Sequence, residues 1–123
     1  MAKAITVLLI IVGVIHLIPL SGVWGTDRLT ALYGMPFRGP DLVILMRHRA
    51  VLFGLLGVFL ICAAFRPSLQ WAAVVAGVIS VASFIVLAAM VGQHNEALRR
   101  VVLADWVALG CLVAAGLLLA RRP

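Results

Sequence analysis

The chain of 123 residues is long enough for one domain, and 65% of its residues are apolar while only 11% carry a charge. This composition excludes a water-soluble globular protein, because too few polar side chains remain to cover an apolar core. The formal net charge is +6, but basic residues lie near the ends of apolar segments, where they anchor helices at the lipid surface, so we expect no nucleic-acid partner.

The first apolar segment runs from about residue 4 to residue 20, which is just enough to cross a bilayer as a helix. A long connection, residues 21–39, follows it. Within this connection Thr26 and Asp27 favour a helix start and Gly34 a helix stop, so we predict a short helical turn. The apolar side of that turn either rests on the membrane surface or plugs the mouth of the bundle. It comprises Leu29, Leu32 and Tyr33.

Three further apolar segments follow the long connection. Pro40 is a favoured first residue of a helix, and Asp41 suits the positive end of the helix dipole. The tight break at residues 66–68 joins the second and third segments as an antiparallel hairpin, and a polar link at residues 92–95 precedes the fourth. The predicted spans are residues 4–20, 40–65, 69–91 and 96–120.

Small residues recur at helical spacing in three of these segments. In lipid, helices associate through close approach of their backbones, so such residues indicate contact faces. The faces comprise Ala50, Gly54 and Gly57; Ala73, Gly77 and Ser80; and Ala104, Ala108, Cys111 and Ala115. They predict an all-α fold, an integral membrane antiparallel four-helix bundle that forms a single domain over residues 1–123. Its two ends carry similar numbers of cations, so the positive-inside rule does not fix the orientation.

All four acidic residues and all three histidines map to one end of the predicted bundle. Arg47 and Asp105 lie seven and nine residues into their predicted helices, so both are about 10 to 14 Å below the helix starts. Arg47 also shares its helix face with Ala50 and Gly54, and so should point into the bundle. An unpaired charge at this depth costs at least about 2.5 kcal/mol. We therefore predict that Arg47 forms an ion pair with Asp105.

Other polar or aromatic side chains lie at the same level on the first, second and fourth spans. Together with the predicted ion pair they form a candidate ligand-binding set: His16, Arg47, His48, Arg49, Asp105 and Trp106. No two of the three histidines have the spacing that makes a metal motif specific. We therefore expect no metal site and no other cofactor.

Several functions fit this set of residues. An amphiphilic ligand, such as a lipid, a quinone or another apolar molecule with a polar head, would bind its head at Arg47 and Arg49. Alternatively, the ion pair has a purely structural role and locks two helices in register. An isomerase-type membrane enzyme with His48 or Asp105 as acid or base is a further hypothesis, and so is a small transporter or ion pathway formed by a homo-oligomer. Membrane lipids are expected partners in every case.

The stretches HLIPLSG (residues 16–22), MRHRAVLFGLLG (46–57) and RRVVLADWVAL (99–109) resemble a family of small proteobacterial four-helix membrane proteins. The resemblance covers nearly the whole chain and implies a multi-pass protein of the bacterial inner (cytoplasmic) membrane. That family has no established function. Some members carry the name phosphopantetheine adenylyltransferase, but the TxGH signature of that soluble enzyme is absent from this sequence. In size and helix number the bundle is also similar to DoxX-like and sterol-isomerase-like proteins, a similarity of architecture that transfers no function.

Overall fold

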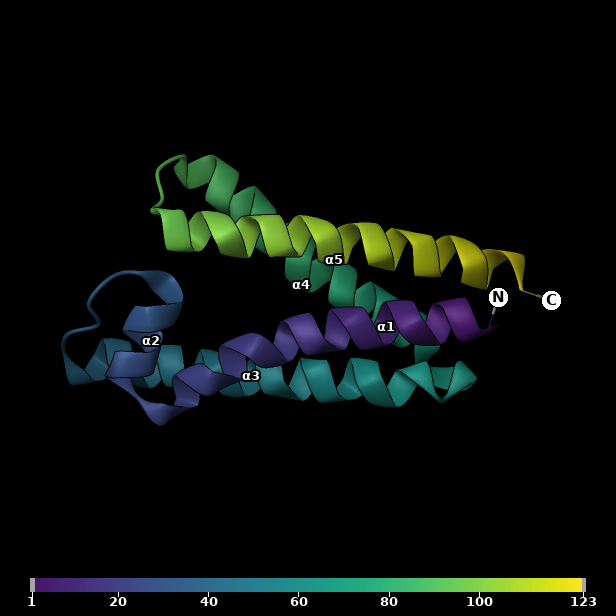
Figure 1. Ribbon diagram of the computed structural model, residues 1–123, viewed down its shortest axis with the longest axis horizontal. Coiled ribbons are helices and arrows are strands. Elements are labelled where there is room, and N and C mark those ends of the chain that lie inside the picture. Colours follow the sequence, from purple (N-terminus) through teal and green to yellow (C-terminus); the bar gives the residue numbers. More distant parts are fainter. Residues whose placement is uncertain (1, 123) are drawn as a thin grey trace.

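The computed structural model describes residues 2–122, and all secondary structure in that range is helical. The elements are α1 (Ala2–Leu17), the 3-10 helix η1 (Ile18–Trp24), α2 (Thr26–Tyr33), α3 (Pro40–Ala64), the 3-10 helix η2 (Pro67–Leu69), α4 (Gln70–Val91) and α5 (Glu96–Arg121). The four long helices run in alternating directions, and α2 lies over the end opposite the two termini (Figure 1). The predicted all-α antiparallel four-helix bundle with a short helical turn in its first loop is confirmed.

The outer faces of the long helices are apolar. Four helical segments are long and apolar enough to cross a membrane, and within each of them only 17% to 28% of the residues are buried inside the bundle. Large apolar side chains such as Leu55, Ile79 and Leu117 are therefore exposed on the outside. A helix on a water-soluble protein would turn such a stripe inward, whereas lipid solvates it. The chain is a small multi-pass membrane protein.

The tightest helix pair is α1 with α3, which meet through glycines. A Cβ atom added to Gly57 would lie 2.9 Å from the carbonyl oxygen of Gly13, and one added to Gly54 would lie 2.6 Å from a methyl group of Leu20. Neither position has room for a larger side chain. α3 packs against α1 and η1, which therefore cover its small-residue face. α5 packs against α1 and α4 instead.

Hydrogen bonds around one carbonyl group close the bundle at the end that holds the termini. The carbonyl oxygen of Ala64, at the end of α3, accepts from the Thr6 hydroxyl of α1 at 2.9 Å and from the Gln70 side chain of α4 at 3.3 Å. Gln70 in turn accepts from Arg122, which follows α5, at 2.8 Å. All four long helices are therefore joined at this end.

The opposite end is covered by α2 and the loop that follows it. Leu29, Tyr33 and Phe37 are buried there and pack on apolar side chains of α3 and α5. Of the two arrangements that the sequence allowed for this turn, the structure therefore has the one in which its apolar side plugs the mouth of the bundle. Gly34 ends α2 in the left-handed conformation, with φ of 69°, which a residue with a side chain adopts at a cost.

Asn95 fastens this cap to the rest of the bundle. Its side-chain oxygen accepts from the backbone N–H of Leu98 at 2.8 Å and so caps the start of α5. Its side-chain nitrogen donates to the carbonyl oxygens of Tyr33 at 2.7 Å and of Gly34 at 3.3 Å. One side chain thus fixes both the first turn of α5 and the last turn of α2.

Candidate functional site

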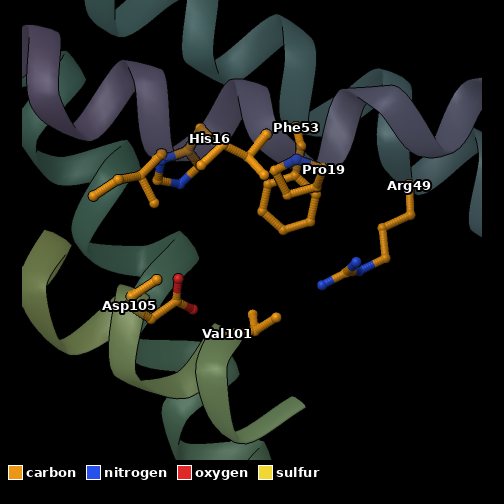
Figure 2. Close-up of a pocket in the computed structure, with 9 residues that line it drawn as sticks. His16, Pro19, Arg49, Phe53, Val101 and Asp105 are labelled. Carbon is orange, nitrogen blue, oxygen red and sulfur yellow. The ribbon is translucent and has the colours of Figure 1, made fainter. Parts of the chain in front are cut away.

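A cavity of about 80 Å³ lies beneath the α2 end, between α1, η1, α3 and α5. Most of its wall is apolar, and its charged groups come from α3 and α5 (Figure 2). The lining residues are Ile15, His16, Ile18, Pro19, Arg49, Phe53, Val101, Ala104 and Asp105. A concave apolar site with a few convergent polar groups is the usual form of a small-molecule site.

Asp105 is the acidic group of this cavity. The residue as a whole is only 8% exposed, and its carboxylate oxygens keep some access from the cavity. Among residues 2–122 the carboxylate has no hydrogen-bond donor and no cation within 4.0 Å. Figure 2 shows its oxygens directed into the cavity. A carboxylate held among apolar side chains without a partner is costly, so this group has a tendency to acquire a donor or a cation.

Arg49 supplies the positive charge on the other side of the cavity (Figure 2). Its guanidinium lies 4.4 Å from the ring centre of Phe53, 5.3 Å from that of Tyr33 and 5.7 Å from that of Phe84. These distances are typical of cation–π contacts. One N–H of Arg49 donates to the Tyr33 hydroxyl, and the structure of residues 2–122 uses no other of its five donors in a hydrogen bond. Arg49 is therefore held in place while most of its donors remain available.

The predicted ion pair between Arg47 and Asp105 is wrong. Arg47 is exposed, and its Nε donates to the carbonyl oxygen of Val23 in η1 at 2.8 Å. The reason is the identity of the neighbouring helix. Arg47 does share the small-residue face of α3, but that face packs on α1 and η1 rather than on α5. Arg49, two residues further round the helix, is the arginine that faces Asp105 across the cavity.

Of the other predicted site residues, the structure brings one to the cavity and leaves two outside. His16 lines the cavity wall. His48 is exposed on α3, and Trp106 is 53% exposed on the outer face of α5. Neither lines the cavity, so a direct ligand contact by either remains a prediction without geometric support.

His16 is buried, and both of its ring nitrogens have partners within the protein. Nδ1 donates to the carbonyl oxygen of Val12 at 2.9 Å, because a carbonyl can only accept. In the neutral ring, Nε2 then accepts from the hydroxyl of Ser80 on α4 at 3.1 Å. His16 therefore joins α1 to α4 and contributes a wall to the cavity rather than a free hydrogen-bonding group.

Replacing His16 by Leu is expected to lower the free energy of unfolding by about 1 kcal/mol, since hydrogen bonds between helices in membranes contribute about that much. In the His16→Leu background, the further change Ser80→Ala should have almost no effect on the free energy of unfolding, because the hydrogen bond between the two residues is already lost. Reversible unfolding in mixed micelles, followed by circular dichroism, measures both. His48→Leu, on an exposed histidine, is the matched control; strictly additive effects of His16→Leu and Ser80→Ala would contradict the bond.

Two larger grooves meet the cavity at Arg49. One, of about 350 Å³, lies along α4 and α5 and is lined by Phe84, Leu87 and Val91 among others. The second, of about 280 Å³, lies under the cap and is lined by Tyr33, Leu98 and other apolar residues. Both grooves and the small cavity include Arg49 in their walls. Both grooves are mostly apolar, although Gln93 and His94 also line the first.

The charged groups lie close to the edge of the hydrocarbon layer. About 20 helical residues span that layer. Counted back from Arg121 they reach Val101, so Asp105 is about 6 Å inside the edge, and the same count from Arg66 places Arg49 about 5 Å inside. α3 and α5 have 25 and 26 residues, so their first turns extend beyond the hydrocarbon. The site is therefore level with the part of a lipid where the head group joins the chains.

These features define a small helical membrane protein with an apolar cavity that presents one cation and one anion near the membrane surface. No protein-family model, no curated protein and no solved structure matches the chain.

Proposed function

We propose that the protein binds an amphiphilic molecule of the membrane, with the polar head of that molecule between Arg49 and Asp105. Lipids, quinones and other apolar molecules with a polar head belong to this class. The observation that supports the proposal most strongly concerns Asp105. The residue is only 8% exposed, and its carboxylate points into a cavity and has no partner among the described residues. A purely structural carboxylate would be expected to pair with a group of the protein.

The apolar surroundings support the same proposal. The two grooves that meet at Arg49 have room for apolar segments of the ligand, and most of their lining residues are apolar. A charge-assisted hydrogen bond from a guanidinium is roughly twice as strong as one between neutral groups, so Arg49 would fix the head while the chain remains in lipid. We place the protein in the bacterial cytoplasmic membrane on the resemblance described above.

Native mass spectrometry of the protein, released from nanodiscs or gentle detergent, tests the proposal. The wild-type chain is expected to retain a bound small molecule. Arg49→Gln and Asp105→Asn should each weaken the affinity for the ligand at least about tenfold and so lower the bound fraction, because each removes a charge-assisted bond of roughly 1.5 to 3 kcal/mol. The same spectra report the number of subunits and so test whether the chain forms a homo-oligomer.

Matched controls separate a site from a general effect of charge. Arg100→Gln and Asp41→Asn remove the same charges from exposed positions on α5 and α3 and should leave the bound fraction unchanged. An empty wild-type protein, or equal binding by all five proteins, would overturn the proposal and favour a structural role.

A further inference from the structure

We propose that the head group bound at this site is a phosphate ester that carries a primary ammonium, as in an aminophospholipid. This inference rests on the proposed function and specifies its ligand. The phosphate would accept from Arg49, and the ammonium would donate to Asp105. Such a ligand is a zwitterion and matches the two opposite charges of the cavity.

The charges of the protein argue for a zwitterion. Arg49 and Asp105 do not pair with each other, because no arginine nitrogen lies within 4.0 Å of the Asp105 carboxylate in residues 2–122. A purely anionic head would satisfy Arg49 and leave Asp105 buried and repelled, whereas a purely cationic head would satisfy Asp105 alone. A head with both charges removes both costs at once.

The size of the cavity argues against a ring. An apolar cavity of roughly 150 Å³ is known to hold one benzene molecule. The cavity beside Asp105 is about 80 Å³, so it takes a few atoms but not an aromatic ring in its present form. A primary ammonium on a two-carbon arm fits this space and brings three N–H donors. A trimethylated ammonium is larger and has no N–H to donate to a carboxylate.

The position of Arg49 connects the three parts of such a lipid. Arg49 borders the small cavity and both larger grooves, so a phosphate at this residue has the Asp105 cavity on one side and apolar side chains such as Phe84 on the other.

The test is a competition among three lipids with identical acyl chains: a phosphatidylethanolamine, a phosphatidylcholine and a phosphatidylglycerol, present in equal amounts in nanodiscs. Native mass spectrometry of the released wild-type protein is expected to show the ethanolamine lipid retained at least about tenfold over the other two. Asp105→Asn should remove the preference over the glycerol lipid, Arg49→Gln should weaken all three, and Asp41→Asn should match the wild type.

The possible failures are distinguishable. Equal retention of the three lipids by the wild type, with losses in Arg49→Gln and Asp105→Asn, would overturn the ammonium assignment and leave the proposed function standing. Equal retention by every variant would mean that the lipid is bound unspecifically, and it would overturn both the ammonium assignment and the proposed function. A preference that persists in Asp105→Asn would also overturn the assignment. Soluble phosphoethanolamine in large excess should not displace the lipid, and displacement would show that the ligand is a water-soluble ester instead.

Discussion

Gly57→Leu is expected to destabilise the protein by about 3 kcal/mol, the upper part of the usual range for overpacking a core. The backbones of α1 and α3 touch at this glycine, where an added Cβ would lie 2.9 Å from the Gly13 carbonyl oxygen and 2.9 Å from a methyl group of Leu17. A backbone oxygen cannot move aside as the end of a flexible side chain can. The two helices must therefore separate along their length.

The measurement is the free energy of unfolding in mixed micelles, or the midpoint of thermal unfolding in one detergent. Gly110→Leu provides the control, because a Cβ at Gly110 on α5 would have no atom within 4 Å and the new side chain would face lipid. We expect Gly110→Leu to unfold like the wild type. If Gly57→Leu were equally stable, α1 and α3 could not be packed as described.

Asn95→Ala is expected to cost about 2 kcal/mol and to loosen the α2 cap. The change removes a helix cap, which contributes about 1 kcal/mol, together with the two bonds to the carbonyl groups of Tyr33 and Gly34. Hydrogen exchange over residues 26–34 should become faster in this variant, because the last turn of α2 is no longer tied to α5.

Two further variants make this prediction specific. Asn95→Asp keeps an oxygen for the N–H of Leu98 but loses both donors, so it should retain the α5 cap while α2 exchanges faster. Gln93→Ala alters an exposed side chain of the same link and should have little effect. Unchanged exchange over residues 26–34 in both Asn95 variants would contradict the role of Asn95 as the fastener.

Most of the fold could be predicted from the sequence because lipid imposes a simple rule. A helix is the only single segment that satisfies its own backbone in hydrocarbon, so each long apolar run had to be one helix. The predicted spans 40–65 and 96–120 agree closely with α3 and α5, and the predicted span 69–91 agrees with α4 and the end of the short helix η2 that precedes it. The first differs more. α1 already ends at Leu17, and residues Ile18–Trp24 continue as a 3-10 helix around Pro19.

The sequence predicted how deep the charged side chains lie along their helices, but not which neighbouring helix each of them faces. Counting residues along α3 and α5 places a basic and an acidic side chain at one level, and Arg49 and Asp105 do share a level and a cavity. Helix periodicity also places Arg47 on the small-residue face of its helix. It does not state which helix covers that face, because order around a bundle depends on packing among all four helices. The wrong choice between Arg47 and Arg49 came from this missing information.

The aromatic surroundings of Arg49 were also missed. Phe53 lies four residues after Arg49, a spacing at which side chains on a helix meet, so this contact carried a signal in the sequence. Tyr33 and Phe84 come from α2 and α4, and nothing in their local sequence indicates that they would meet the same guanidinium.

The hydrogen bonds at Ala64 distinguish the two halves of the bilayer for this molecule. At that end the side chains of Thr6 and Gln70 tie the helices to a single carbonyl, and Arg122 extends the connection. The end beneath α2 has the charged cavity instead. A molecule that reaches Arg49 and Asp105 from the bilayer should therefore arrive from the leaflet on the α2 side.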